Sequence, residues 1–195
     1  MKIGGIQPFS LCDYPGKISA VVFVQGCNFR CPFCHNKALI PEKKKSPSAF
    51  NVEEVFRFLK ERQGQLDGIV ISGGEPCLQT GLASFIRTIR KMDYKVKLDT
   101  NGSFTDPLNH FIKNDLVDFI AMDVKAPLDK YNKLAGVTTN PAEIQKSMEI
   151  ISASQLPHQF RTTWDKNLLT AEDIEEIRTI IPTSSEYVVQ ECNYH

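Results

Sequence analysis

The sequence lacks an apolar run long enough to cross a membrane. Its longest uninterrupted apolar stretch is Ala20–Val24, whereas a membrane-spanning helix needs roughly 20 residues. The N-terminus carries one lysine and no apolar core, and Pro8 stands where a secretory signal would place that core. We therefore expect no membrane partner, no secretion signal and a cytoplasmic location.

The chain also lacks an excess of charge of either sign. Lys and Arg total 23, Asp and Glu total 23, and the formal net charge is +0. A protein that binds nucleic-acid phosphates generally carries a basic excess or stripe, so we expect no nucleic-acid partner. The 195 residues are 42% hydrophobic and 24% charged, which suits one globular domain with a buried core. We expect a single domain over residues 1–195.

Short apolar segments alternate with amphipathic ones along the chain. The predicted strands are Ile18–Val24, Gly68–Ile71, Lys95–Asp99, Val117–Asp123, Gln159–Thr163 and Tyr187–Gln190. The predicted helices are Val52–Leu59, Leu82–Ile89, Leu108–Ile112, one that opens at Asn140, and Thr170–Ile181. This alternation predicts an α/β fold with a parallel sheet. An open doubly wound sheet and a partial barrel both fit the pattern. The basic, proline-bounded segment 41–48 predicts an exposed loop.

Three of the six cysteines lie within eight residues, directly after the first predicted strand. Because nothing sends the chain to an oxidising compartment, clustered thiols indicate metal or redox chemistry rather than disulfides. A cubane iron–sulfur cluster is normally held by four cysteines, so three leave one iron open, as a catalytic metal requires. The three cysteines of this loop, residues 25–36, are Cys27, Cys31 and Cys34.

The alternative for this loop is a zinc site completed by His35, Cys12 or Cys77. Structural zinc loops usually supply their ligands as two pairs, and no second pair lies nearby. The adjacent side chains of Cys34 and His35 would also struggle to occupy two corners of one tetrahedron. The spacing therefore favours iron–sulfur over zinc and leaves a non-catalytic zinc-binding scaffold as the weaker alternative.

Polar motifs follow the next three predicted strands. Ser72–Pro76 contains paired glycines, which let the backbone approach a ligand closely. Leu98–Gly102 and Met122–Lys125 each place an acid at a strand end, and the latter adds a lysine. Since ligands of parallel α/β folds bind at the carboxyl ends of the strands, we expect these motifs to meet there.

The cysteine loop resembles the cluster motif of the radical S-adenosylmethionine (SAM) superfamily. Further segments look like the anaerobic ribonucleoside-triphosphate reductase-activating protein family: Gly5–Lys17, Leu98–Gly102, Ala121–Pro127 and Phe160–Thr163. The resemblance implies a (β/α)6 partial TIM-like barrel. It also implies one [4Fe–4S] cluster on Cys27, Cys31 and Cys34, with SAM as the second cofactor.

The same resemblance implies roles for individual residues and requires no protein side chain to act as a catalytic acid or base. The motif Gly73, Gly74 and Glu75 would hold the SAM ammonium group. Phe33 would pack near the adenine, His35 would border the nucleoside, and Cys34 would also contact the cofactors. The SAM carboxylate would be surrounded by Asp99, Thr100, Asp123, Val124 and Lys125. The two aspartates would also help to hold a monovalent cation.

The implied reaction is an electron transfer from the reduced cluster to SAM, which breaks a carbon–sulfur bond. The resulting 5′-deoxyadenosyl radical would abstract hydrogen from a backbone glycine of an anaerobic ribonucleoside-triphosphate reductase. Flavodoxin or ferredoxin would be the low-potential electron donor. The alternatives are a pyruvate formate-lyase-type activase and an enzyme similar to 7-carboxy-7-deazaguanine synthase. Relatives often continue into another helix after the sixth strand, so contacts beyond His195 stay open.

Overall fold

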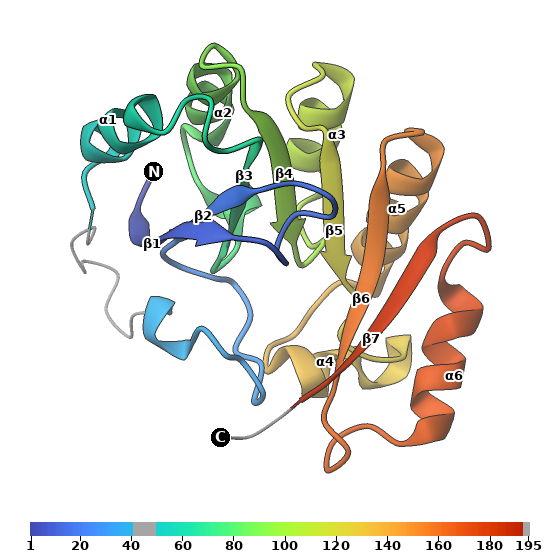
Figure 1. The fold of residues 1–195 in the computed structure, drawn as a ribbon. Helices are drawn as coiled ribbons and strands as arrows, with labels where there is room; N and C mark the ends of the chain where they lie inside the picture. Colours follow the sequence, from blue (N-terminus) through green and yellow to red (C-terminus); the bar gives the residue numbers. More distant parts are fainter. Residues whose placement is uncertain (41–49, 193–195) are drawn as a thin grey trace.

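The computed structural model describes residues 1–40 and 50–192, which build one seven-stranded sheet with helices around it (Figure 1). The strands follow one another in the sheet in chain order. They are β1 (Ile3–Ser10), β2 (Ser19–Val24), β3 (Gly68–Gly73), β4 (Lys95–Thr100), β5 (Phe119–Asp123), β6 (His158–Trp164) and β7 (Glu186–Glu191). The β1–β2 pair is antiparallel and every later pair is parallel. Because β1 and β7 are the two edges, the barrel stays open between them.

Helices cross over between successive parallel strands and lie along the outside of the sheet (Figure 1). The α-helices are α1 (Val52–Glu61), α2 (Leu82–Arg90), α3 (Thr105–Lys113), α4 (Tyr131–Ala135), α5 (Pro141–Ala153) and α6 (Ala171–Ile180). Three single turns are 3-10 helices: η1 (Lys37–Leu39), η2 (Pro76–Leu78) and η3 (Leu128–Lys130). A capping box begins α1: the Asn51 side chain accepts backbone N–H groups of the first turn, and the Glu54 carboxylate accepts the backbone N–H of Asn51 over 3.1 Å.

The hydrophobic core lies on both faces of the sheet. Ala20, Val22 and Val24 of β2 belong to the large cluster that packs against the helices. Val21 points the other way and joins Tyr14, Val70, Phe119 and Ala121 in a small cluster on the inner face. A strand buried on both faces needs apolar residues at consecutive positions, which explains the continuous apolar run in β2.

The predicted fold class is confirmed, and each of the six predicted strands has a counterpart in β2–β7. One strand and one α-helix of the described chain were not predicted. β1 contains Gly4, Gly5 and Pro8, residues that are depleted in strands and that weaken the strand pattern. The five-residue α4 is too short to show helical periodicity. The predicted loop 41–48 lies outside the described residues.

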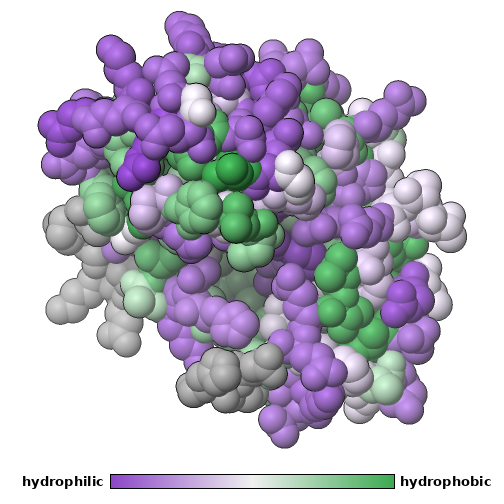
Figure 2. Space-filling model, in the orientation of Figure 1, coloured by the Kyte–Doolittle hydropathy of each residue, from purple (hydrophilic) through white to green (hydrophobic). Residues whose placement is uncertain are grey.

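No helix among the described residues is long and apolar enough to span the hydrocarbon core of a membrane. The space-filling surface is hollowed near its centre in the view of Figure 2, and hydrophobic side chains lie beside the hollow. The exposed large hydrophobic residues in the described part of the chain include Phe9, Leu11 and Ile18, all at or near the β1–β2 connection.

Candidate functional site

A cavity of about 330 Å³ lies at the carboxyl ends of the parallel strands. Segments far apart in the sequence meet in it, from the β1–β2 connection to β7. Its walls include the three loop cysteines, the paired glycines and four charged side chains: Cys27, Cys31, Cys34, Gly73, Gly74, Asp99, Asp123, Lys125 and Arg161. The strand-end motifs therefore meet in one cavity, as the sequence predicts.

The cysteine loop is held in place largely by backbone contacts. The N–H of Arg30 donates to the carbonyl of Ala135, at the end of α4, over 2.7 Å. A Cβ at the next residue, Gly136, would lie 2.2 Å from the Arg30 carbonyl oxygen, and Gly136 has a φ of +67°. Only glycine tolerates both the close approach and this conformation. The short helix that sequence analysis missed thus supports the loop.

The three thiols border one cavity but differ in exposure. Cys31 is buried, and Cys27 and Cys34 are partly exposed. Burial raises the pKa of the Cys27 thiol to about 11, partly offset by the N–H of Phe29, which donates to its sulfur over 3.3 Å. Burial also raises the pKa of Cys31, against the opposing charge of Lys125. In the described part of the chain, no three His, Cys, Asp or Glu side chains converge on a position for a single metal ion.

The paired glycines let the end of β3 lie directly against the end of β2 and the cysteine loop. Gly73 has a φ of +104°, and a Cβ there would lie 2.7 Å from the backbone nitrogen of Val24. A Cβ on Gly74 would lie 2.1 Å from the carbonyl oxygen of Gly26. Both distances are far below ordinary contact, so these positions require glycine. The pair fixes the loop as well as lining the cavity.

Glu75 follows the glycines but its side chain turns away from the cavity. It is fully buried, and its carboxylate accepts hydrogen bonds from the Cys77 N–H (2.9 Å), the Thr100 hydroxyl (2.8 Å) and the Asn101 N–H (2.8 Å). Burial raises the pKa of Glu75, and these hydrogen bonds oppose the rise. The carboxylate therefore joins η2 to the end of β4.

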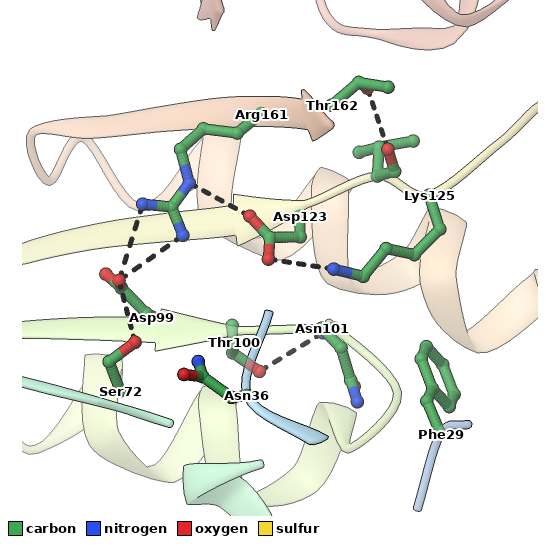
Figure 3. Close-up of polar contacts among 12 residues, drawn as sticks. Phe29, Asn36, Ser72, Asp99, Thr100, Asn101, Asp123, Lys125, Arg161 and Thr162 are labelled. Carbon is green, nitrogen blue, oxygen red and sulfur yellow. Dashed lines mark hydrogen bonds and ion pairs between the residues drawn. The ribbon is translucent and has the colours of Figure 1, made fainter. Parts of the chain in front are cut away.

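Charged side chains in or just after three neighbouring strands form a continuous network in the wall of the cavity, and Figure 3 shows its contacts. Arg161 of β6 lies between two carboxylates: its Nε donates to Asp123 over 2.9 Å, and its two terminal nitrogens lie 3.4 Å from Oδ2 of Asp99. Lys125 pairs with the other oxygen of Asp123 at 2.9 Å. Asp99 also pairs with the buried Lys97. The network thus joins three cations to two carboxylates.

The network shifts the ionisation of its members. Burial alone raises the pKa of Asp123, but the charges and hydrogen bonds of Arg161 and Lys125 outweigh burial and hold that pKa well below its usual range. Burial alone lowers the pKa of Lys125 and of Arg161, and the carboxylates reverse both effects. All three groups are therefore charged across the whole physiological pH range.

Aromatic side chains of the cysteine loop complete the wall. Phe33 is buried, and Nζ of Lys125 lies 5.9 Å from the centre of its ring. His35 also lines the cavity, and its Nε2 lies 3.5 Å from the sulfur of Cys192 just after β7. Cys192 had no predicted role, yet it lies beside the cysteine loop.

Most of the predicted site residues surround the same cavity. Those that line it are Cys27, Cys31, Phe33, Cys34, His35, Gly73, Gly74, Asp99, Thr100, Asp123 and Lys125. Glu75 and Val124 are fully buried and are not among its lining residues in the described chain. No role in the site was predicted for Arg161, Lys97 or Asn101. For Arg161 a signal existed: a lone charged residue inside a buried strand requires a charged partner.

Comparison with known proteins identifies the family to which this chain is similar. The family model described as Radical SAM superfamily matches residues 21–181. A protein of Methanocaldococcus jannaschii named "Putative glycyl-radical enzyme activating enzyme" is 37% identical over 194 residues, which cover 97% of this chain and 79% of the relative. The crystal structure of Streptococcus suis SuiB bound to S-adenosylmethionine superposes with a TM-score of 0.70 at 15% identity, over 90% of this chain and 40% of SuiB. That structural likeness shows the fold.

Two further relatives have different activities in their names. A pyruvate formate-lyase-activating enzyme of Listeria monocytogenes is 29% identical over 136 residues, covering 64% of this chain and 53% of that enzyme. A 7-carboxy-7-deazaguanine synthase of Thermoplasma acidophilum is 31% identical over 121 residues, covering 62% of this chain and 53% of that enzyme. The chain therefore spans about half the length of these two relatives.

Proposed function

The chain belongs to the radical SAM superfamily, and on that premise we propose that it activates a glycyl-radical enzyme. One observation carries the proposal: the three loop thiols, the paired glycines and the charged network meet in one cavity at the carboxyl ends of the parallel strands. The long match to the Methanocaldococcus jannaschii relative supports it. We further propose an anaerobic ribonucleoside-triphosphate reductase as the partner, on the motifs that run from Gly5 to Thr163.

The residues around the cavity fit the two cofactors of the superfamily, a [4Fe–4S] cluster and SAM. Three thiols supply the ligands for a cluster with one open iron, and the sulfur of Cys27 already accepts a backbone hydrogen bond. Charged groups of both signs suit the ammonium and carboxylate groups of SAM. When bound, the two cofactors supply one-electron radical chemistry, and the protein supplies binding, orientation and the exclusion of water.

Each part of the wall has a proposed role. Cys27, Cys31 and Cys34 hold the cluster, and Lys125 binds the SAM carboxylate. The backbone at Gly73, Gly74 and Glu75 holds the ammonium group, with Asp99, Thr100, Asp123 and Val124 shaping the carboxylate end, and with Phe33 and His35 beside the nucleoside. A monovalent cation at the two aspartates stays a prediction, and it would have to share both carboxylates with Arg161.

The size of the cavity supports a macromolecular substrate. Its volume of about 330 Å³ is at the lower end of the roughly 300–1,000 Å³ typical of small-molecule pockets. A cavity that holds SAM and borders a cluster leaves little room for a second small molecule. On this proposal the reacting group comes from a protein loop, and the unpaired edges β1 and β7 leave the barrel open for it.

The test is an activation assay under strict exclusion of oxygen. The protein is reconstituted with iron and sulfide, reduced chemically or with flavodoxin or ferredoxin, and mixed with SAM and a recombinant anaerobic ribonucleotide reductase. We expect a glycine-centred doublet in the electron paramagnetic resonance spectrum that depends on SAM and disappears in Cys34→Ala. A doublet on pyruvate formate-lyase alone would change the proposed partner.

The second candidate is a small-molecule enzyme similar to 7-carboxy-7-deazaguanine synthase. The identity of 31% over 121 residues to the Thermoplasma acidophilum enzyme favours it. The same assay separates the two candidates when a pterin-like small molecule replaces the reductase. Cleavage of SAM coupled to turnover of that molecule, with no radical on either protein partner, would establish the second candidate and refute the first.

A further inference from the structure

A buried amide faces one of the three thiols of the cysteine loop. Asn101 directly follows β4 and is 6% exposed. Its Nδ2 lies 3.0 Å from Oδ1 of Asn28 and 3.9 Å from the sulfur of Cys27. We propose that Asn101 is a positioning residue that raises the reduction potential of the cluster through an N–H···S hydrogen bond to Cys27. The inference rests on the proposed role of Cys27 as a cluster ligand.

The orientation of the Asn101 amide follows from its partners. Its Oδ1 accepts hydrogen bonds from the backbone N–H of Ser103 over 3.0 Å and from the Ser103 hydroxyl over 2.6 Å. A backbone N–H can only donate, so the oxygen of the amide must face it. The NH₂ group consequently faces the cysteine loop, where it has two hydrogens to donate.

The position of Asn101 is fixed from behind by Glu75. The buried carboxylate of Glu75 accepts the backbone N–H of Asn101 over 2.8 Å. On the other side, Nδ2 of Asn28 donates to the Ser103 hydroxyl over 2.8 Å, which closes a ring of hydrogen bonds between the cysteine loop and the β4–α3 connection. An amide held on both sides can act on the sulfur with little reorganisation.

The sign of the effect follows from electrostatics. Reduction adds an electron to the cluster and increases the negative charge on its sulfur ligands. A hydrogen-bond donor directed at a ligand sulfur stabilises the more negative state and therefore raises the reduction potential. The N–H of Phe29 donates to the same sulfur over 3.3 Å, so Asn101 adds to an existing contact. The donated N–H makes the cluster easier to reduce by a given electron donor.

The test compares cluster-loaded variants by anaerobic redox titration followed by electron paramagnetic resonance. Asn101→Ala removes the donor to Cys27 and the acceptor for Ser103 without adding charge. Asn101→Asp keeps the acceptor and removes the donor, and its added negative charge lowers the potential in the same direction. Each should shift the one-electron reduction equilibrium at least about tenfold toward the oxidised cluster, which is 59 mV more negative. Iron content should stay at the wild-type value in Asn101→Asp.

The matched control is Ser103→Ala, which removes a hydroxyl from the same ring while leaving the donor to Cys27. It should shift the reduction equilibrium less than threefold. An unchanged potential in Asn101→Asp with full iron content would overturn the inference, and so would an equal shift in Ser103→Ala.

If both Asn101 variants lose iron, pulsed electron paramagnetic resonance of the wild-type protein decides. A side-chain amide nitrogen coupled to the reduced cluster supports the inference, and its absence refutes it. None of these measurements uses a glycyl-radical partner, so failure of the activation assay would leave their outcome unaffected.

Discussion

Replacing Arg161 with methionine should destabilise the protein through the charged network rather than through packing. The guanidinium lies between Asp99 and Asp123 and its side chain is 15% exposed. Methionine keeps most of the apolar stem and removes the charge. After the change Asp123 retains Lys125 as a partner, and Asp99 retains Lys97. Neither carboxylate is left without a cation, and this limits the loss in the free energy of unfolding.

The magnitude follows from the contacts that are lost. The bond from Nε to Asp123 is 2.9 Å long, and a hydrogen bond to a charged group contributes about 1.5–3 kcal/mol. The two contacts to Asp99 are long at 3.4 Å, and the Asp123 side chain is 31% exposed to solvent. We therefore expect the free energy of unfolding to fall by about 2–3 kcal/mol. For a domain of this size that lowers the Tm by roughly 4–12 °C.

The pH dependence distinguishes this mechanism from a packing defect. The pKa of Asp123 is lowered in the folded state, so its stabilising contribution is fully present above the unfolded pKa of about 3.9. The contribution is lost as the pH falls through the lowered folded pKa. The unfolded chains of wild type and Arg161→Met titrate alike, so the difference in stability between the two proteins should be constant from about pH 7 to 5. It should shrink only as the pH falls through the folded-state pKa of Asp123 in the variant, where Lys125 still opposes protonation.

Urea unfolding of reduced protein at a series of pH values measures this difference. The matched control is Arg178→Met, because Arg178 pairs with Glu175 on the surface of α6 at 3.5 Å and both side chains are more than half exposed. That change should cost less than about 1 kcal/mol. A loss below about 1 kcal/mol at pH 7 for Arg161→Met, or a loss that grows as the pH is lowered, would refute the reasoning.

Three further predictions concern the loop and its supports. Alanine at any of the three loop cysteines should abolish the brown chromophore and iron content measured after reconstitution, whereas Cys192→Ala should keep both. Gly74→Ala should lose SAM affinity in calorimetry and also lose iron, because the new Cβ would lie 2.1 Å from the Gly26 carbonyl oxygen. Gly5→Ala, whose Cβ meets only ordinary contacts from 3.6 Å, should lose neither. Glu75→Gln should lower the free energy of unfolding by about 1–3 kcal/mol, measured in urea, because its NH₂ would face a backbone donor.

The sequence predicted the repeating part of the fold well because burial on both faces leaves a strong local signal. The run in Ile18–Val24 and the capping box at Asn51 are patterns of neighbouring residues, and both appear in the structure. β1 could not be predicted in the same way. It is an edge strand with two glycines and a proline, so its structure comes from pairing with β2 rather than from its own residues.

The same distinction between local patterns and distant partners applies to the candidate site. The cysteine spacing and the strand-end motifs are local, and the topology of a parallel sheet brings strand ends together. The direction in which Glu75 turns is not local, because it is decided by donors from η2 and β4. The role of Arg161 depends on two aspartates from other strands. Such partners become visible only when the strands are assembled.

These contacts explain why the residues around the cavity identify the superfamily more readily than they identify the protein partner. The cysteine loop is fixed by backbone hydrogen bonds from Arg30 to Ala135 and from Glu75 to Gly26, and the charged network is fixed by side chains that pair with one another. This machinery serves the cofactors, whatever substrate is brought to them. A protein partner would instead contact residues outside this machinery. The target is therefore established with the candidate partners themselves, because the residues proposed to hold the cofactors do not depend on it.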